Sequence, residues 1–443
     1  MEGALIRAAA STQPLDAFIS ETESYHRDEM NHSTVLRLLV FCTLIVSSCV
    51  KAQRLESHAP RVSTSNNQIT SIPADVLLGG GILLQARVNN SASLWFALDS
   101  GSGAGFIIDS RRAKALRLEL QGSGVSTGAG EHSVDFNFAG NVSINLSGTE
   151  FPSQRVAVIA LDALEPFSGR TLDGIIGYGL FSSYIVEIDY AAHRVNLYDL
   201  QSYRYSGSGT RLPLTIEKDH FYIPVKVAMP NHTSVEAKLM VDSGAPTATV
   251  VLNRPFVEKH KLLADTGRII LDRSLPGLGG ETKQLLSRAR ELQLDDLIIQ
   301  NPTIMLSQDA AGSLASSSFD GIIGGELLRR FKVVFDTAHH QLILEPNAYF
   351  AEPYEHNMSG IGLRAEGRDF KTIRIYRLIA DSPAAQAGLR EGDEIVSIDS
   401  KSASDFTLDQ LYRMFKHEGR EYVFSILRGQ AKLQTKIKLR RLI

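Results

Sequence analysis

The chain has 443 residues, of which 43% are hydrophobic and 21% are charged, and its formal net charge is −3. This length allows two to four domains, and the composition is that of an ordinary globular protein. The nearly balanced charge gives no reason to expect a nucleic-acid partner.

The first 52 residues are predicted to be a leader with a signal peptide. Residues 38–46, LLVFCTLIV, form an apolar run that is too short to cross a bilayer as a helix and suits the core of a signal peptide. Arg37 supplies the positive flank. Because the residues before Met30 are polar and mixed, we expect translation to start at Met30.

Two processing sites remain open in this leader. The sequence VSSC at 46–49 resembles a bacterial lipoprotein signal, in which Cys49 is lipidated, whereas VKA at 50–52 fits an ordinary signal peptidase. The two cysteines of the chain, Cys42 and Cys49, both lie here, so the body that follows would hold neither a disulfide nor a thiol nucleophile. We therefore expect an exported protein, either periplasmic or attached to the cell envelope by a lipid anchor.

Residues 53–70 are polar and aperiodic and are predicted to be a linker. Short apolar segments with Gly, Asn and Ser between them follow, and this pattern favours β-structure. A short helix is expected within 107–118, with Ser110 as its N-cap. Two strands at 180–200 then close a first unit, which spans 71–203.

A second unit, at 204–350, repeats the parts of the first in the same order. An apolar strand pattern runs into Asp-Ser-Gly at Asp99 and again at Asp242. Each copy has an Asp-Gly-Ile-Ile-Gly segment downstream, 74 positions on in the first unit (99 to 173) and 78 in the second (242 to 320). A similar closing hairpin follows each, so the sequence indicates an internal duplication.

The pattern changes near residue 350, and residues 351–443 form a third unit. The segment SPAAQAGLREGDEIVSID at 382–399, followed by a predicted helix at 407–415, resembles a PDZ domain of the bacterial type. PDZ domains bind a peptide as an added strand, and a backbone loop receives its terminal carboxylate. The alternative is a module that packs only on its own chain. The residues of the matching loop that we expect to bind peptide are Gly360, Ile361, Gly362 and Leu363.

Two Asp-Ser-Gly loops that face each other would bring Asp99 and Asp242 together. Two carboxyl groups a few ångströms apart share one proton and titrate as a coupled pair. One is then a base and the other an acid, so a water between them can attack a carbonyl that the acid polarises. This chemistry is peptide hydrolysis without a metal or a covalent intermediate.

The residues that follow each aspartate suit this chemistry. Gly101 and Gly244 let the backbone come close to the carboxyl groups. Ser100 and Ser243 offer hydroxyls that can bond to the opposite loop. The two Ile-Ile-Gly segments would pack under the loops as an apolar floor.

These paired loops, each with its later Asp-Gly-Ile-Ile-Gly and closing hairpin, resemble aspartic peptidases of the retropepsin/pepsin type over 71–350. The order of units resembles bacterial retropepsin-like proteins with a C-terminal PDZ domain. The resemblance implies a mainly β fold, with two pseudo-symmetric aspartic-peptidase-like lobes followed by a PDZ-like α+β domain. It also implies endopeptidase activity, a catalytic pair at Asp99 and Asp242, and a cleft between the lobes that is roofed by a hairpin flap.

The chain departs from this family pattern in three ways. Serine replaces the more usual threonine after each catalytic aspartate. The first loop continues with Ser102 where the second has Ala245, so one hydrogen bond that supports the pair is expected to be missing. The candidate flaps, 124–133 and 275–284, contain no tyrosine of the kind that pepsin's flap uses.

Other chemistries fit the sequence less well. Asp173 and Asp320 are predicted to bind loop backbone and to be structural. The histidines lack the spacing of metal ligands, so we expect neither a metal nor another cofactor.

Two functions therefore remain. One is an exported aspartic endopeptidase that acts on protein or peptide substrates, with a PDZ-like domain that binds peptide or gates substrate. The other is a non-catalytic peptide-binding protein on a decayed aspartic-peptidase scaffold. The duplication predicts a whole active site in one chain, so a monomer suffices, although an obligate dimer is the alternative.

Overall fold

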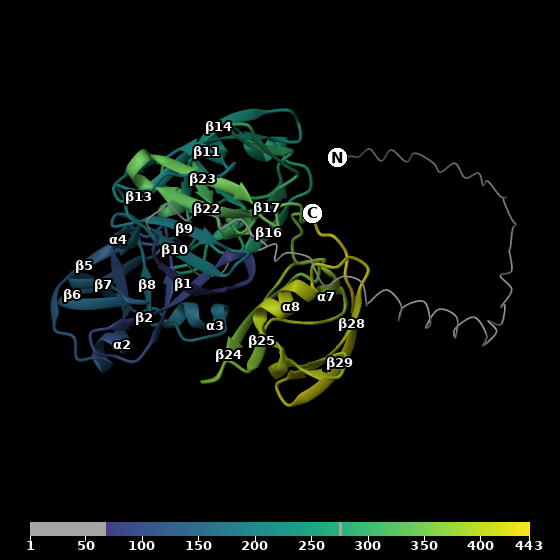
Figure 1. Ribbon diagram of the computed structural model, residues 1–443. Helices are drawn as coiled ribbons and strands as arrows, with labels where there is room; N and C mark the ends of the chain where they lie inside the picture. The colour runs from purple at the N-terminus through teal and green to yellow at the C-terminus, as the bar shows by residue number, and fades with distance from the viewer. Residues whose placement is uncertain (1–67, 274–276) are drawn as a thin grey trace, which may run out of the picture. The chain divides into compact units, whose positions relative to one another are not determined.

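A computed structural model of the protein describes residues 68–273 and 277–443, and β-strands dominate it (Figure 1). The predicted signal peptide, the lipidation candidate Cys49 and all but the end of the predicted linker lie outside the described residues. Within the described ranges, no helix is long and apolar enough to cross a membrane.

The first unit is a sheet of mixed direction with short helices between its strands. Its strands are β1 (Gln68–Val76), β2 (Ile82–Val88), β3 (Leu94–Leu98), β4 (Phe106–Asp109), β5 (Leu120–Thr127), β6 (Ser133–Leu146), β7 (Thr149–Ile159), β8 (Gly174–Ile176), β9 (Ile185–Asp189) and β10 (Arg194–Tyr198). Its helices are η1 (Leu78–Gly80), α2 (Ser110–Ala115), η2 (Asp162–Leu164), α3 (Glu165–Ser168) and α4 (Tyr178–Phe181).

Two local predictions in this unit are corrected by the structure. Strand β1 begins at Gln68, inside the predicted linker, because it pairs with β10 from that residue on. The N-cap of α2 is Asp109 and not Ser110, since the Asp109 carboxylate accepts hydrogen bonds from the backbone N–H groups of Arg111 and Arg112.

The second unit repeats this plan. Its strands are β11 (Thr210–Pro213), β12 (Thr215–Glu217), β13 (His220–Ala228), β14 (Ser234–Val241), β15 (Val250–Leu252), β16 (Ile270–Arg273), β17 (Lys283–Arg288), β18 (Glu291–Leu294), β19 (Leu297–Gln300), β20 (Thr303–Ser307), β21 (Gly321–Ile323), β22 (Phe331–Asp336) and β23 (Gln341–Pro346). Its helices are α5 (Arg254–Lys259), η3 (Leu262–Asp265), η4 (Ser313–Ala315), α6 (Gly325–Leu328) and η5 (Thr337–His339).

Strand pairing shows the duplication directly. In the first unit β3 is parallel to β8, and β8 is antiparallel to β4. In the second unit β14, β21 and β15 pair in the same way. The last residue of each strand before the loop, Leu98 or Val241, pairs with the second isoleucine of Ile-Ile-Gly, Ile176 or Ile323. Each Asp-Ser-Gly loop therefore rests on its own Ile-Ile-Gly strand, as the sequence predicts.

The closing hairpins join the two units. Hairpins β9–β10 and β22–β23 meet through the antiparallel pairing of β9 with β22, so one sheet runs in the order β11-β23-β22-β9-β10-β1. Phe181, Phe221 and Phe335 lie next to this sheet and are fully buried, with ring centroids 4.8–5.4 Å apart. The two units thus share a hydrophobic core, because residues of both contribute to the same aromatic cluster.

The third unit has its own sheet, in the order β24-β25-β26-β28-β29, with β24 at the edge. A separate core that includes Ile375, Phe415 and Phe424 lies beneath it. The predicted mainly β fold with a C-terminal α+β domain is confirmed. The elements of the third unit are β24 (Ile361–Glu366), β25 (Thr372–Leu378), α7 (Pro383–Gln386), β26 (Glu394–Ile398), β27 (Lys401–Ser402), η6 (Ala403–Asp405), α8 (Leu408–Met414), β28 (Glu421–Arg428) and β29 (Ala431–Lys438).

Candidate active site

The two Asp-Ser-Gly loops cross and bind each other through their serines. The Ser100 hydroxyl donates to the carbonyl of Val241 at 2.8 Å and accepts the N–H of Ser243 at 3.0 Å. The Ser243 hydroxyl donates to the carbonyl of Leu98 at 2.9 Å and accepts the N–H of Ser100 at 3.0 Å. Both serines are buried, so these four bonds fix one loop against the other.

The glycine of each loop makes room for the aspartate of the other loop. A Cβ atom at Gly101 would overlap the carboxyl carbon of Asp242, and a Cβ atom at Gly244 would overlap that of Asp99. Each glycine N–H also donates to the aspartate of its own loop, at 2.9 Å for Asp99 and 2.8 Å for Asp242. Neither glycine has a positive φ, so close approach is what requires glycine here.

The Asp99 and Asp242 carboxyl groups each lie against the glycine of the opposite loop, so the two are close neighbours. Two carboxyl groups this close share one proton. Burial raises the pKa of both carboxyls, and the negative charge of Asp99 and its hydrogen bond raise the pKa of Asp242 still further. The pKa of Asp99 rises less, since the bond from Asp242, the N–H of Gly101 and the charge of His220 all favour its ionised form. The two carboxyl groups therefore hold one proton between them.

The difference between Ser102 and Ala245 costs no backbone hydrogen bond. The backbone N–H of Ser102 lowers the pKa of Asp99, and the backbone N–H of Ala245 lowers the pKa of Asp242 in the same way. Both loops keep this donor because it belongs to the main chain.

One histidine that no sequence motif pointed to lies beside the first loop. A Cβ atom at Gly103 would lie 2.8 Å from Cε1 of His220, at the start of β13. The ring is held by a hydrogen bond of 2.6 Å between its Nδ1 and the carbonyl of Lys218. In the second loop the position equivalent to Gly103 is Pro246, and it faces Gly81 instead. The imidazole is thus present on one side of the pair of aspartates.

The two candidate flaps bind each other. The N–H of Gly130 donates to the carbonyl of Leu278 at 3.0 Å, and the N–H of His132 donates to that of Gly279 at 2.9 Å. The Leu278 side chain packs against an apolar cluster of the first unit that includes Ile175. Each unit therefore contributes a hairpin tip, and the tips are linked by main-chain hydrogen bonds.

An apolar cluster borders each Asp-Ser-Gly loop. On the first side, Ala104 packs beside Ile175. On the second side, Ala245 packs with Met240 and Ile322. The pair of aspartates thus has apolar side chains on both flanks.

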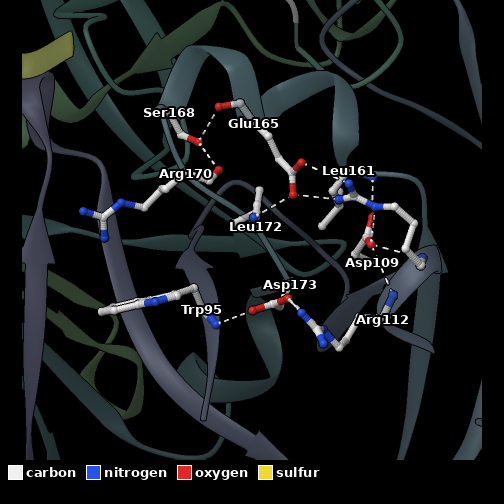
Figure 2. A network of polar contacts seen from close by, with 10 residues as sticks. Trp95, Asp109, Arg112, Leu161, Glu165, Ser168, Arg170, Leu172 and Asp173 are labelled. Carbon is white, nitrogen blue, oxygen red and sulfur yellow. Dashed lines mark hydrogen bonds and ion pairs between the residues drawn. The ribbon is translucent and has the colours of Figure 1, made fainter. Parts of the chain in front are cut away.

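Asp173 and Asp320 support the strands next to the loops. Asp173 accepts the backbone N–H of Trp95 at 2.8 Å and pairs with Arg112, as Figure 2 shows. Asp320 accepts the backbone N–H of Lys238 at 2.7 Å. Both carboxylates bind main chain as predicted, but these N–H groups belong to strands β3 and β14 and not to loops. In the described part of the chain, no group of three or more His, Cys, Asp or Glu side chains could hold a metal ion.

The predicted peptide-binding loop of the third unit already has partners for two of its donors. The N–H of Ile361 donates to the Ser359 hydroxyl at 3.1 Å, and that of Leu363 donates to the Tyr412 hydroxyl at 2.8 Å. Gly360 has a φ of +79°, which favours glycine. At Gly362 a Cβ atom would lie 2.7 Å from the ring of Tyr376. Two backbone donors of the loop thus face side-chain hydroxyls.

One serine pattern invites comparison with serine hydrolases. Residues 124–128 read Gly-Val-Ser-Thr-Gly, which matches the Gly-x-Ser-x-Gly pattern of a nucleophile elbow. That elbow needs a strand-to-helix turn, whereas Ser126 lies within β5, which forms a hairpin with β6, and it is exposed. The strand context therefore does not supply a nucleophile elbow.

Comparisons with known proteins agree with the two predicted modules. The aspartyl protease family profile matches residues 84–180, and the PDZ domain profile matches residues 374–441. A curated relative, the probable CtpA-like serine protease of Staphylococcus haemolyticus (strain JCSC1435), is 29% identical over 129 residues, which are 29% of this chain and 24% of the relative. The chain thus spans about a quarter of that relative's length.

Among solved structures, the aspartic proteinase from Irpex lacteus is similar with a TM-score of 0.39 and 15% identity, over 64% of this chain and 98% of that one. The two family profiles thus show a segment similar to aspartyl proteases at 84–180 and a PDZ-domain segment at 374–441.

Proposed function

We propose that this protein is an aspartic endopeptidase in which Asp99 and Asp242 are the catalytic pair. The observation that carries the proposal is the juxtaposition of these two carboxyl groups across crossed, serine-linked loops, each against the glycine of the other loop. A partly buried carboxyl pair with one proton costs folding free energy, because burial destabilises charge. A pair of this kind on matching loops is typical of general acid–base chemistry.

In the proposed reaction, Asp99 is the base and Asp242 is the acid. A water between them gives a proton to Asp99, and its oxygen attacks the carbonyl carbon of the peptide bond. Asp242 gives its proton to the carbonyl oxygen, so a neutral diol forms. Asp99 then passes its proton to the amide nitrogen, and the C–N bond breaks. Asp242 recovers a proton from one diol hydroxyl as the new carboxyl group forms.

The linked hairpin tips affect how a substrate would reach the two aspartates. Gly130 and Leu278 are joined by a main-chain hydrogen bond, so this bond would break before a chain passes beneath the tips. The apolar clusters next to the loops, with Ile175 and Ile322, favour substrates with apolar side chains on both sides of the cleaved bond. Both loops belong to one chain, which supports a monomer as the active form.

We extend the proposal to location and to the third unit. The apolar run at 38–46 and the absence of cysteine after Cys49 support an exported protein, with a lipid anchor at Cys49 as one form of attachment. The edge strand β24 and its preceding loop support binding of a peptide with a free C-terminal carboxylate. Protein or peptide substrates and such a peptide ligand are the partners that we propose.

The test is cleavage of a mixed peptide library by the full chain, from mildly acidic to neutral pH, beside Asp99→Asn and Asp242→Asn. We expect cleavage by the parent and a loss in both variants. Cleavage that survives both substitutions would contradict the mechanism. Peptide binding without cleavage by any of the three proteins would instead support the non-catalytic peptide-binding function.

A further inference from the structure

The sheet of the PDZ domain ends at β24. The outer side of β24, which faces away from β25, pairs with no other described strand. Leu363 lies opposite Ile375, whose N–H donates to the carbonyl of Asp393 and whose carbonyl accepts the N–H of Gly392. Because the main-chain groups of Ile375 point toward β26, those of Leu363 point away from β25. An added peptide strand would pair with this edge.

Parts of the same chain cover that edge. The Tyr412 hydroxyl of α8 accepts the Leu363 N–H at 2.8 Å and lies 3.4 Å from the Leu363 carbonyl oxygen. Helix α3 of the first unit packs against β24. A Cβ atom on Gly169, which ends α3, would lie 3.9 Å from Cβ of Ala365 on β24 and 3.6 Å from Cδ1 of Leu408 on α8. The segment thus reaches both elements between which a PDZ ligand would lie.

An aromatic contact strengthens this packing. The Phe167 ring of α3 meets the Tyr376 ring of β25 edge-on, with centroids 5.0 Å apart and an angle of 79°. Aromatic pairs of this geometry add stability beyond the area that they bury. The contact therefore favours the state in which α3 covers β24.

We propose that residues 165–169 are an internal competitor for the peptide ligand of the PDZ domain, an inference that rests on the proposed peptide binding by β24. A peptide strand and the α3 segment cannot occupy the same edge together. Binding of a peptide therefore requires that α3 leave β24, and the apparent affinity falls by the fraction of molecules in which the edge is free.

The same segment is tied to the candidate active site. The Glu165 carboxylate accepts the N–H of Leu172 at 3.0 Å and pairs with Arg111 at 2.7 and 3.0 Å. Figure 2 shows how this carboxylate lies beside the chain that leads to Asp173. Strand β8 begins directly after Asp173. Its last carbonyl, that of Ile176, accepts the N–H of Asp99 at 2.9 Å. Hydrogen bonds thus connect the α3 segment to the strand under the Asp99 loop.

The chain contains a natural reporter of this movement. Trp95 is its single tryptophan, and the guanidinium of Arg170 lies 5.3 Å from the centre of its ring. Arg170 directly follows Gly169, so displacement of α3 would move a cation away from the indole. The emission of Trp95 should change when a peptide replaces α3.

The test locks α3 onto β24 with a disulfide. The Cβ separation at positions 169 and 365 fits the 3.5–4.5 Å span of disulfides, so Gly169→Cys with Ala365→Cys should oxidise to a bridge. The full chain would carry Cys42→Ser and Cys49→Ser to prevent other pairings. It would also carry Asp99→Asn, so that peptide capture does not depend on cleavage. The probe is a pool of random ten-residue peptides with free C-terminal carboxylates, and the same pool with amidated ends is its control.

We expect the reduced protein to capture carboxylate-ended peptides, with a change in Trp95 emission, and the oxidised protein to capture about tenfold less. Phe167→Ala, without the bridge, should bind the pool more tightly than the Asp99→Asn parent does. Equal capture by the oxidised and reduced forms would overturn the proposal. The proposal would also be overturned if neither the reduced form nor Phe167→Ala captured carboxylate-ended peptides better than amidated ones. In that case no peptide would bind at the edge of β24, and α3 would have no ligand to compete with. These readouts stay informative if the protein proves not to cleave peptides.

Discussion

The two Asp-Ser-Gly loops follow one plan and differ in what lies beside them. In the first loop Gly103 touches the His220 ring, which belongs to the second unit, whereas in the second loop Pro246 touches Gly81. Duplication supplies two carboxyl groups in matching positions. The His220 ring on one side, with no counterpart on the other, then makes the surroundings of the two carboxyl groups unequal, and a positive charge on this ring favours ionisation of Asp99.

A second difference lies after each Ile-Ile-Gly strand. In the second unit, the position that corresponds to Gly179 holds Glu326, which is buried and contacts Lys416 of the PDZ domain at 3.5 Å. In the first unit, α3 makes the contact with that domain. The PDZ domain thus reaches both halves of the duplication, and each half binds it with residues that its counterpart lacks.

The largest effect is expected at the two aspartates. Asp99→Asn and Asp242→Asn should each lower kcat/KM by about 10³-fold or more, because each removes one partner of the acid–base pair. Asp135→Asn, an exposed carboxylate on β6, is the matched control and should leave the rate unchanged. The measurement is the initial rate of peptide cleavage. Unequal losses, with one variant close to the parent, would contradict the shared role.

Glu326→Gln tests the difference between the halves. Burial opposes its ionisation, but Lys416, Arg329 and Arg330 more than offset this and lower the pKa of Glu326 to about 2. A depressed carboxyl pKa contributes stability above the unfolded value of 4.5, and this stability is lost as pH falls from 4.5 toward 2. We expect the substitution to cost about 3 kcal/mol at neutral pH and to flatten the acid dependence of Tm.

Glu345→Gln is the control for that experiment, since Glu345 is a partly exposed partner of Lys332. It should change the unfolding free energy by less than about 1 kcal/mol. Denaturant unfolding at pH 7 and pH 3.5 measures both variants. An equal cost at the two pH values would contradict the pKa assignment.

Gly101→Ala and Gly244→Ala break the close approach of the loops. Each new methyl group would overlap the opposite carboxyl group, so the loops must separate, and we expect about a 100-fold loss of activity. Gly267→Ala is the control, because a Cβ atom there meets no neighbour. Cleavage rates and Tm are the readouts. Retention of full activity in either loop variant would show that the glycines are not needed for space.

Ser100→Ala and Ser243→Ala each leave a buried N–H of the opposite loop without its partner. We expect a loss of about 1–3 kcal/mol in unfolding free energy for each. The double variant should cost less than the sum, because the four bonds act together. Ser126→Ala, at an exposed site on β5, is the comparison. Strict additivity would argue against a linked pair of loops.

The smallest effect concerns the asymmetry itself. The charge of His220 lowers the pKa of Asp99, so His220→Gln should raise it. The acidic limb of the pH profile of kcat/KM would then move to higher pH. His232→Gln, an exposed histidine in the next turn, should leave the profile in place. A shift of the limb to lower pH would reverse the assignment of base and acid.

Local patterns in the sequence determined much of this protein. The apolar-Asp-Ser-Gly and Asp-Gly-Ile-Ile-Gly segments are short, and each stands on its own strand, so a reader of the chain can align the two units and pair Asp99 with Asp242. The PDZ signature is equally local, since its helix cap and Gly turns lie within a few residues of one another. The N-cap at Asp109 was missed because Ser110 is an equally good cap by residue type.

Only the tertiary structure decided the contacts between distant segments. The pairing of β9 with β22, the link between Gly130 and Leu278, and the packing of α3 on β24 join residues that are far apart in sequence. None of these contacts has a periodic signature, because each depends on how whole units pack. The position of His220 beside Asp99 is of the same kind. Sequence placed two equivalent carboxyl groups, and the fold made them unequal by burying them in surroundings of different charge.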